Sequence, residues 1–139
     1  MYAQKLMLTL FLFIFTVLLT GCGLETKTFT EFYKNDLEDV TKIQIHDGST
    51  GSIETAKSKI ITDEKVIDEF LSEIKDVQFI PEENQEDRVG FLYSITLYED
   101  EQMTFIFTEN EVTDYYYYTE PDIYPIVDSF YKNLKVEEE

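Results

Sequence analysis

The chain has 139 residues, and its 29 acidic and 11 basic residues give a formal net charge of −18 at pH 7. A surface this negative repels nucleic acid and anionic lipid headgroups, so neither is expected as a partner. Apolar residues make up 43% of the chain and aromatic residues 15%, which excludes an intrinsically disordered protein.

The N-terminus has the features of a signal peptide. Lys5 precedes an apolar run from Leu6 to Leu19, and small residues follow that run. As a helix the run would be about 21 Å long, against roughly 30 Å for the hydrocarbon core of a bilayer, which disfavours an ordinary membrane span. An uncleaved N-terminal anchor is the alternative, and both interpretations place the rest of the chain outside the cytoplasm.

The only cysteine of the chain stands at the end of this segment, in the sequence Leu19-Thr20-Gly21-Cys22. This sequence resembles the bacterial lipobox, Leu-small-small-Cys, at which a secreted protein is lipidated and then cleaved before the cysteine. The resemblance implies a diacylglycerol and palmitate anchor on Cys22, and such an anchor holds a protein at a membrane effectively permanently. In size and composition the chain also resembles the small lipoproteins of unassigned function that are common in Gram-positive bacteria.

These observations predict how the chain is organised. Residues 1–21 form the lipoprotein signal peptide, residues 22–28 form a lipidated tether, and residues 29–139 form a single domain large enough to bury its own core. The anchor uses the one thiol, so no disulfide is expected. The mature protein is expected at the cell membrane, lipid-anchored on the extracytoplasmic face.

The first part of the domain predicts a short helix followed by a hairpin. Apolar residues recur at helical spacing in the first segment, and they are Phe29, Phe32, Tyr33, Leu37 and Val40. Alternation from Thr41 to His46 predicts a strand with Ile43 and Ile45 inward, turn residues fill 47–51, and an extended pattern resumes from 53 to 61. The glycine-flanked turn lacks the lysine and the spacing of a phosphate-binding loop.

A helix is predicted after Thr62, its expected N-cap. Its apolar face consists of Val66, Ile67, Phe70, Leu71 and Ile74. Pro81 ends a short apolar stretch, and residues 82–87 form an acidic loop. Clustered carboxylates can hold calcium, but the loop lacks the ligand order of an EF-hand, so a solvated loop is the favoured interpretation.

The second half predicts three strands and a helix. The strands cover residues 91–98, 103–108 and 112–118, with acidic or asparagine-containing turns between them. Asp122 is the expected N-cap of the last helix, whose apolar face is Ile123, Ile126, Val127, Phe130 and Leu134. The predicted fold class is α+β: a mainly antiparallel sheet, formed by an N-terminal hairpin and a three-stranded meander, with two amphipathic helices packed on one face.

The sequence predicts no catalytic residue, no metal site and no cofactor. His46 is the one histidine, and with the cysteine used by the anchor the usual metal sites and nucleophile–base pairs cannot be assembled. A pair of carboxylates could hydrolyse glycosides, but 29 acids make some pair inevitable. An enzyme is therefore not expected, and a secreted-side hydrolase or a cation-binding protein is the less favoured alternative.

The run from Tyr115 to Tyr118 is the one candidate contact surface. Strand alternation would place two of these tyrosines on the open face of the sheet, and tyrosine is favoured at binding surfaces. The alternative is that the rings only cover the sheet. The sequence thus predicts a membrane-anchored, non-catalytic surface binding module with a protein partner. The resemblance to small lipoproteins adds an alternative, an immunity or exclusion factor that blocks a partner at the cell surface.

Overall fold

The computed structural model describes residues 1–9 and 23–139. Cys22 and most of the apolar run lie outside the described residues. In the part of the chain that the structure describes, no helix is both long and apolar enough to cross a membrane.

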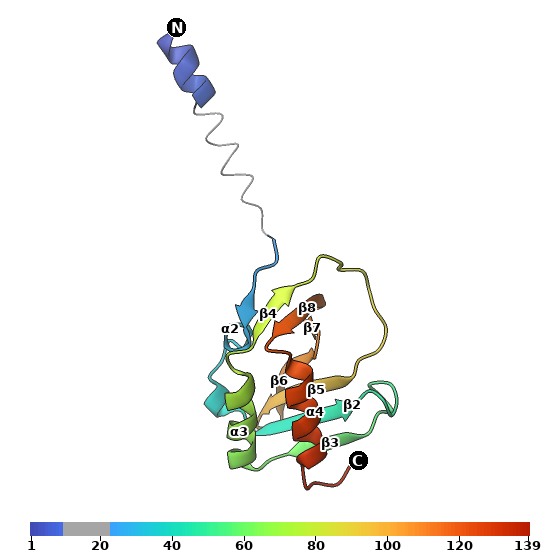
Figure 1. The fold of residues 1–139 in the computed structure, drawn as a ribbon. Helices are drawn as coiled ribbons and strands as arrows, with labels where there is room; N and C mark the ends of the chain where they lie inside the picture. Colours follow the sequence, from blue (N-terminus) through green and yellow to red (C-terminus); the bar gives the residue numbers. More distant parts are fainter. Residues whose placement is uncertain (10–22) are drawn as a thin grey trace.

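Residues 23–139 form an α+β fold built on one antiparallel sheet of eight strands (Figure 1). The strand order is β1-β4-β8-β7-β6-β5-β2-β3. The strands are β1 (Lys27–Thr28), β2 (Lys42–Asp47), β3 (Ser58–Ile61), β4 (Gln78–Pro81), β5 (Tyr93–Glu99), β6 (Gln102–Thr108), β7 (Glu111–Val112) and β8 (Tyr115–Glu120). The helical elements are α2 (Phe29–Phe32), the 3-10 turn η1 (Leu37–Asp39), α3 (Glu64–Ile74) and α4 (Ile123–Asn133).

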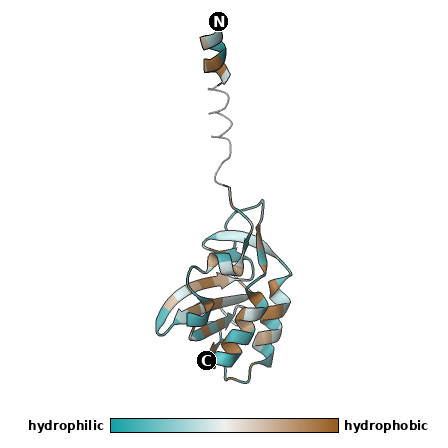
Figure 2. Ribbon diagram, turned by 90° about the vertical axis from the view of Figure 1, so that its left-hand side faces the viewer, coloured by the Kyte–Doolittle hydropathy of each residue, from teal (hydrophilic) through white to brown (hydrophobic). Residues whose placement is uncertain are grey.

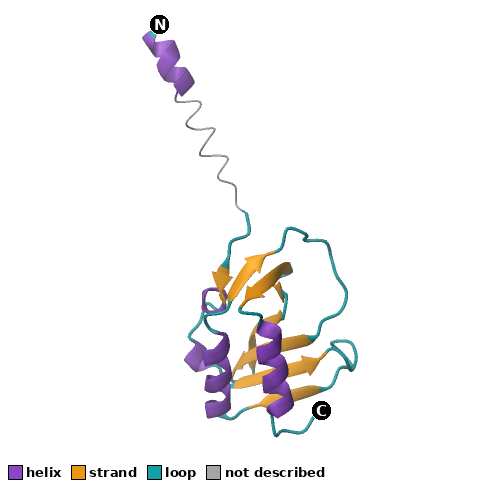
Figure 3. Cartoon of the chain, in the orientation of Figure 1, coloured by secondary structure: helices purple, strands orange, loops and turns teal. Residues whose placement is uncertain are grey.

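Each of the two longer helices begins after an aspartate whose side chain caps it. Asp63 caps α3, one residue later than expected, because its carboxylate accepts a hydrogen bond of 3.2 Å from the Val66 amide. Asp122 caps α4 by accepting a 3.0 Å hydrogen bond from the Tyr124 amide, which confirms the N-cap predicted there. Figure 3 shows α3 and α4 side by side in front of the strands.

One buried core contains residues of the strands and of these two helices. Residues on one face of β2, β5 and β6 and on the apolar faces of α3 and α4 are buried in a single cluster, whose members include Ile43, Ile45, Ile95, Leu97, Phe107, Ile67, Phe70, Ile74, Ile123 and Val127. The Phe70 ring stacks on Phe130 with 4.4 Å between ring centroids. Figure 2 shows hydrophobic segments in both the strands and the helices.

Three predicted elements differ from the structure. The segment 29–40 holds only the single turn α2 and the turn η1 in place of one helix. The extended pattern from 53 to 61 forms a strand only at β3, because residues 48–57 close a loop through turns such as Ala56 N to Ser52 O (2.6 Å). The predicted strand 112–118 is two strands, because Thr113 and Asp114 adopt φ angles of 51° and 67° and reverse the chain.

The sheet also starts earlier than the expected end of the tether. Lys27 and Thr28 already form β1, opposite Phe79 and Gln78 of β4. The Thr28 hydroxyl accepts a hydrogen bond of 3.3 Å from the Glu31 amide, and the Thr28 amide donates one of 2.7 Å to the Glu31 carboxylate. This capping box fixes the chain direction at the point where the domain begins.

Candidate functional site

The pairing of the strands defines a second face of the sheet. Residues that pair across neighbouring strands share a face, and successive residues alternate between faces. The face that alternates with Ile43, Ile45 and Ile95 carries mostly polar residues, and we call it the outer face. Its central members are Gln44, His46, Ser94, Thr96, Ile106 and Thr108, which pair with one another across β2, β5 and β6.

A groove of about 560 Å³ lies on the outer face along β6. Its volume is within the usual range of ligand sites. Four segments of the chain contribute to its lining, and one of them holds Phe91 and Ser94, before and in β5. Ile53 comes from the loop between β2 and β3, Ile106 and Thr108 come from β6, and Glu111 and Asp114 come from β7 and the turn after it.

The groove has an apolar part that is half-exposed. Ile53, Met103 and Ile106 line it with exposed fractions of 46%, 57% and 46%. Met103 reaches this face through a β-bulge: the register between β5 and β6 shifts at Leu97 and Tyr98, so that Met103 pairs with Tyr98. Met103 therefore lies on the opposite face from Phe105, although strict alternation along the strand would place both residues on one face. Large apolar side chains gathered and half-exposed beside a groove are typical of a contact surface.

The other part of the groove is negatively charged. Burial raises the pKa of the Glu111 carboxyl, and the negative charges of Asp114, Asp87 and Glu109 raise it further. Within residues 23–139, the ion pairs of the structure involve neither Glu111 nor Asp114. The groove thus ends in carboxylates whose charge is not compensated by a neighbouring base.

The four tyrosines of β8 are divided between buried and exposed positions. Tyr117 packs edge-on against Phe32 and Phe79 in the core, with ring centroids 5.5 and 6.2 Å away. Alternation places Tyr116 and Tyr118 on the outer face, but Tyr116 is only 5% exposed while Tyr118 is 50% exposed. The prediction of two tyrosines open to solvent on that face is therefore wrong for Tyr116.

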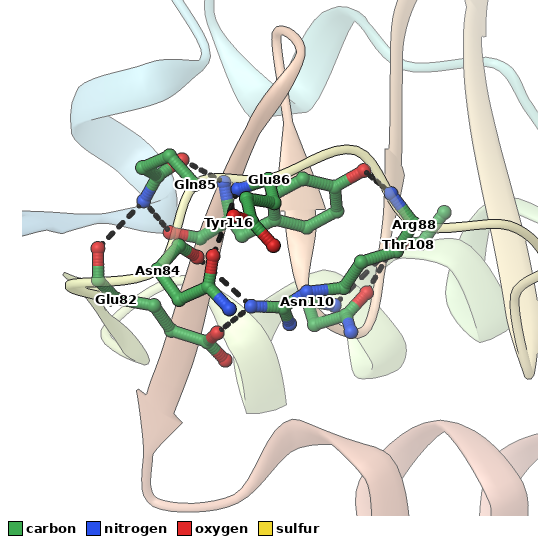
Figure 4. Close-up of polar contacts among 8 residues, drawn as sticks. All are labelled: Glu82, Asn84, Gln85, Glu86, Arg88, Thr108, Asn110 and Tyr116. Atoms are coloured by element: carbon green, nitrogen blue, oxygen red, sulfur yellow. Dashed lines mark hydrogen bonds and ion pairs between the residues drawn. The ribbon is translucent and has the colours of Figure 1, made fainter.

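Tyr116 is covered by residues 82–90, which we call the strap (Figure 4). The Arg88 guanidinium lies 4.5 Å from the centroid of the Tyr116 ring, and the Arg88 amide donates a 2.9 Å hydrogen bond to the Tyr116 hydroxyl. Arg88 also forms an ion pair with Glu82. The acidic loop 82–87 is thus held against the sheet through Glu82 and Gln85, while Glu83, Asn84, Glu86 and Asp87 are exposed to solvent as predicted for a solvated loop.

His46 does not line the groove. His46 lies on the outer face opposite Ser94, its Nδ1 is buried without a hydrogen-bond partner in the described structure, and burial lowers the pKa of its imidazole. In residues 1–9 and 23–139 there is no group of three or more His, Cys, Asp or Glu arranged to hold a metal ion. Cys22 lies outside the described residues.

Sequence reasoning missed the groove itself. Ile106 was a signal, because it is a large apolar residue at a polar-face position of a predicted strand. The contributions of Ile53 and Asp114 had no such signal, since they depend on how two distant turns come together. Comparison with protein family models, curated proteins and solved structures found no match for this chain.

Proposed function

We propose that this chain is a lipid-anchored protein of the extracytoplasmic face of the cell membrane, and that its domain is a non-catalytic module that binds a protein partner. In this proposal the lipid is attached to Cys22, as the resemblance to the lipobox implies. Lys27 of β1 is the fifth residue after Cys22, and five extended residues span at most about 18 Å. The partner is therefore itself located at or near the membrane surface.

The observation that carries the proposal is the groove on the outer face. In this proposal the helices α3 and α4 cover one face of the sheet that contains the hairpin β2–β3 and the strands β5 to β8. The other face is left for the partner. Covering the half-exposed side chains of Ile53, Met103 and Ile106 stabilises a complex by about 25 cal/mol for each Å² of apolar surface removed from water. Binding therefore accounts for their exposure.

The residues that line the groove support binding over catalysis. None of the described lining residues is a histidine, a cysteine or a lysine. Ser94, Thr104, Thr108 and Thr113 also line the groove, but no hydrogen bond of the described residues joins their hydroxyls to the carboxylate of Glu111 or Asp114. The lining therefore favours a binding role for the groove.

Photo-cross-linking in intact cells tests this proposal. Met103 of the full chain is replaced by p-benzoylphenylalanine, and a matched chain carries the same residue at Asp68, an exposed position of α3. We expect one discrete protein adduct from position 103 and none of that mass from position 68. An Ile106→Glu substitution, which places a charge in the groove, should remove the adduct. Equal adducts from both positions, or no adduct at position 103, would contradict the proposal.

A further inference from the structure

The chemistry of the groove identifies the kind of segment that it binds. We propose that the partner presents an extended peptide in which an apolar side chain and a lysine or arginine stand two residues apart. The apolar side chain packs against Ile53, Met103 and Ile106, and the cation lies between Glu111 and Asp114. This inference rests on the proposed function, because it names the partner of the same groove.

The spacing of the two parts follows from the geometry of β6. Ile106 and Thr108 are successive residues on the outer face, so their side chains are about 7 Å apart. Glu111 stands beside Thr108, because the Glu111 amide donates a 3.0 Å hydrogen bond to the Thr108 hydroxyl. An extended peptide repeats its side chains on one face with the same two-residue spacing. An apolar residue and a basic residue that stand two positions apart therefore match the two parts of the groove.

The charges of the site require a cation from outside the domain. Partial burial holds the pKa of Glu111 above its ordinary value, and the like charges of Asp114, Asp87 and Glu109 add to this effect. The basic residue of the strap, Arg88, is already engaged by Glu82, by the Asn84 carbonyl at 2.9 Å and by the Tyr116 ring. A lysine or arginine of a partner would supply the missing positive charge at a partly desolvated site, where charge pairs contribute most to binding.

Two other occupants fit the groove less well. A metal ion would leave the apolar part uncovered, and the described residues include no group of three or more ligands suited to a metal. An anionic lipid headgroup would be repelled by Glu111 and Asp114. A peptide with one apolar and one basic side chain satisfies both parts at once.

Selection from a random heptapeptide library tests the inference. The full lipidated chain is held in nanodiscs of zwitterionic phosphatidylcholine, and empty nanodiscs remove unspecific binders. We expect the enriched peptides to share an apolar residue two positions away from a lysine or arginine. Their affinity should fall on the order of tenfold for Glu111→Gln with Asp114→Asn. It should be unchanged for Asp68→Asn with Glu69→Gln, which remove the same charge from α3.

The outcomes separate this inference from the proposed function. Enriched peptides without a basic residue, or wild-type affinity in the Glu111→Gln, Asp114→Asn variant, would overturn the inference. So would equal losses in the two double variants, because these would reflect net charge alone. If the adduct at position 103 persists in cells that carry Glu111→Gln with Asp114→Asn, the inference fails and the proposed function stands. If that adduct is never formed, the proposed function itself fails.

Discussion

The side chain of Gln85 pairs with the backbone of Tyr116 as a neighbouring strand would. Its Oε1 accepts a 2.9 Å hydrogen bond from the Tyr116 amide, and its Nε2 donates a 2.9 Å hydrogen bond to the Tyr116 carbonyl. The same Nε2 donates to the Glu82 carbonyl at 2.7 Å. One side chain thus satisfies both backbone groups of a residue in β8 and fixes the strap in place.

Gln85→Ala should loosen the strap. The substitution leaves the Tyr116 amide without its hydrogen-bond acceptor and removes one of the donors to the Tyr116 carbonyl. The free energy of unfolding should fall by about 1–3 kcal/mol. Hydrogen exchange at the Tyr116 amide should become faster than in the wild type. Glu83→Ala, an exposed position of the same segment, is the control and should leave both quantities unchanged. Equal exchange rates in wild type and Gln85→Ala would show that the strap is held by other contacts.

Lys59 contributes to stability through the end of α4. It is 8% exposed, and its ammonium donates hydrogen bonds of 2.8 and 3.2 Å to the carbonyls of Tyr131 and Leu134. Lys59→Met keeps the apolar stem and removes the hydrogen-bond donor. The free energy of unfolding, measured by urea denaturation, should therefore fall by about 1–3 kcal/mol. Lys65→Met on the exposed side of α3 should change stability by no more than about 0.5 kcal/mol. A similar effect of the two variants would mean that only net charge matters.

Phe70 is the largest fully buried side chain of α3. Its side chain is fully buried and stacks on Phe130, so Phe70→Ala should cost about 3–5 kcal/mol through lost burial and a residual cavity. Chemical denaturation of the wild type and the variant measures this difference. Tyr118→Ala removes an aromatic ring that is half-exposed, and it should cost much less. If both variants unfold at the same urea concentration, the buried position of Phe70 is wrong.

The ionised side chain of Glu111 should lower the stability of the folded domain at neutral pH. Its pKa is raised in the folded protein by burial and by neighbouring carboxylates, so its ionised form disfavours folding. Glu111→Gln should therefore raise the melting temperature at pH 7. The advantage should shrink as the pH falls through the folded-state pKa, because the wild-type carboxyl then becomes neutral as well. Asp68→Asn, on exposed α3, is the control. A lower melting temperature for Glu111→Gln at pH 7 would contradict the electrostatic account of the groove.

The lipid anchor is tested by metabolic labelling with a fatty-acid analogue. The wild-type chain should be labelled and should sediment with membranes, because Cys22 stands at the position that the resemblance to the lipobox marks for lipidation. Cys22→Ser should carry no label. Labelling of both chains to the same extent would exclude the anchor.

Elements with a strong local pattern were predictable from the sequence. The apolar residues of α3 recur every three or four positions, and Ile67, Phe70 and Ile74 are buried as that pattern indicates. The alternation around Ile43 and Ile45 predicted β2 in the same way.

Features that depend on turns and on distant contacts were not predictable. The split between β7 and β8 arises from positive φ angles at Thr113 and Asp114, a pair without the asparagine–glycine signal of a tight hairpin. The strap depends on Gln85 meeting a residue 31 positions later in the chain. The groove required both the bulge that turns Met103 outward and the approach of the loop that carries Ile53.

The two-residue strand β1 has a mechanical consequence for an anchored protein. A partner that moves relative to the membrane would place a load on the tether, and β1 is the first structured element to receive it. Lys27 and Thr28 pair with β4 over only two positions, so little force is needed to detach them. Phe29 follows immediately, fully buried and with its amide bonded to the Val77 carbonyl at 3.0 Å. The domain would therefore lengthen slightly under tension before any force reaches its core.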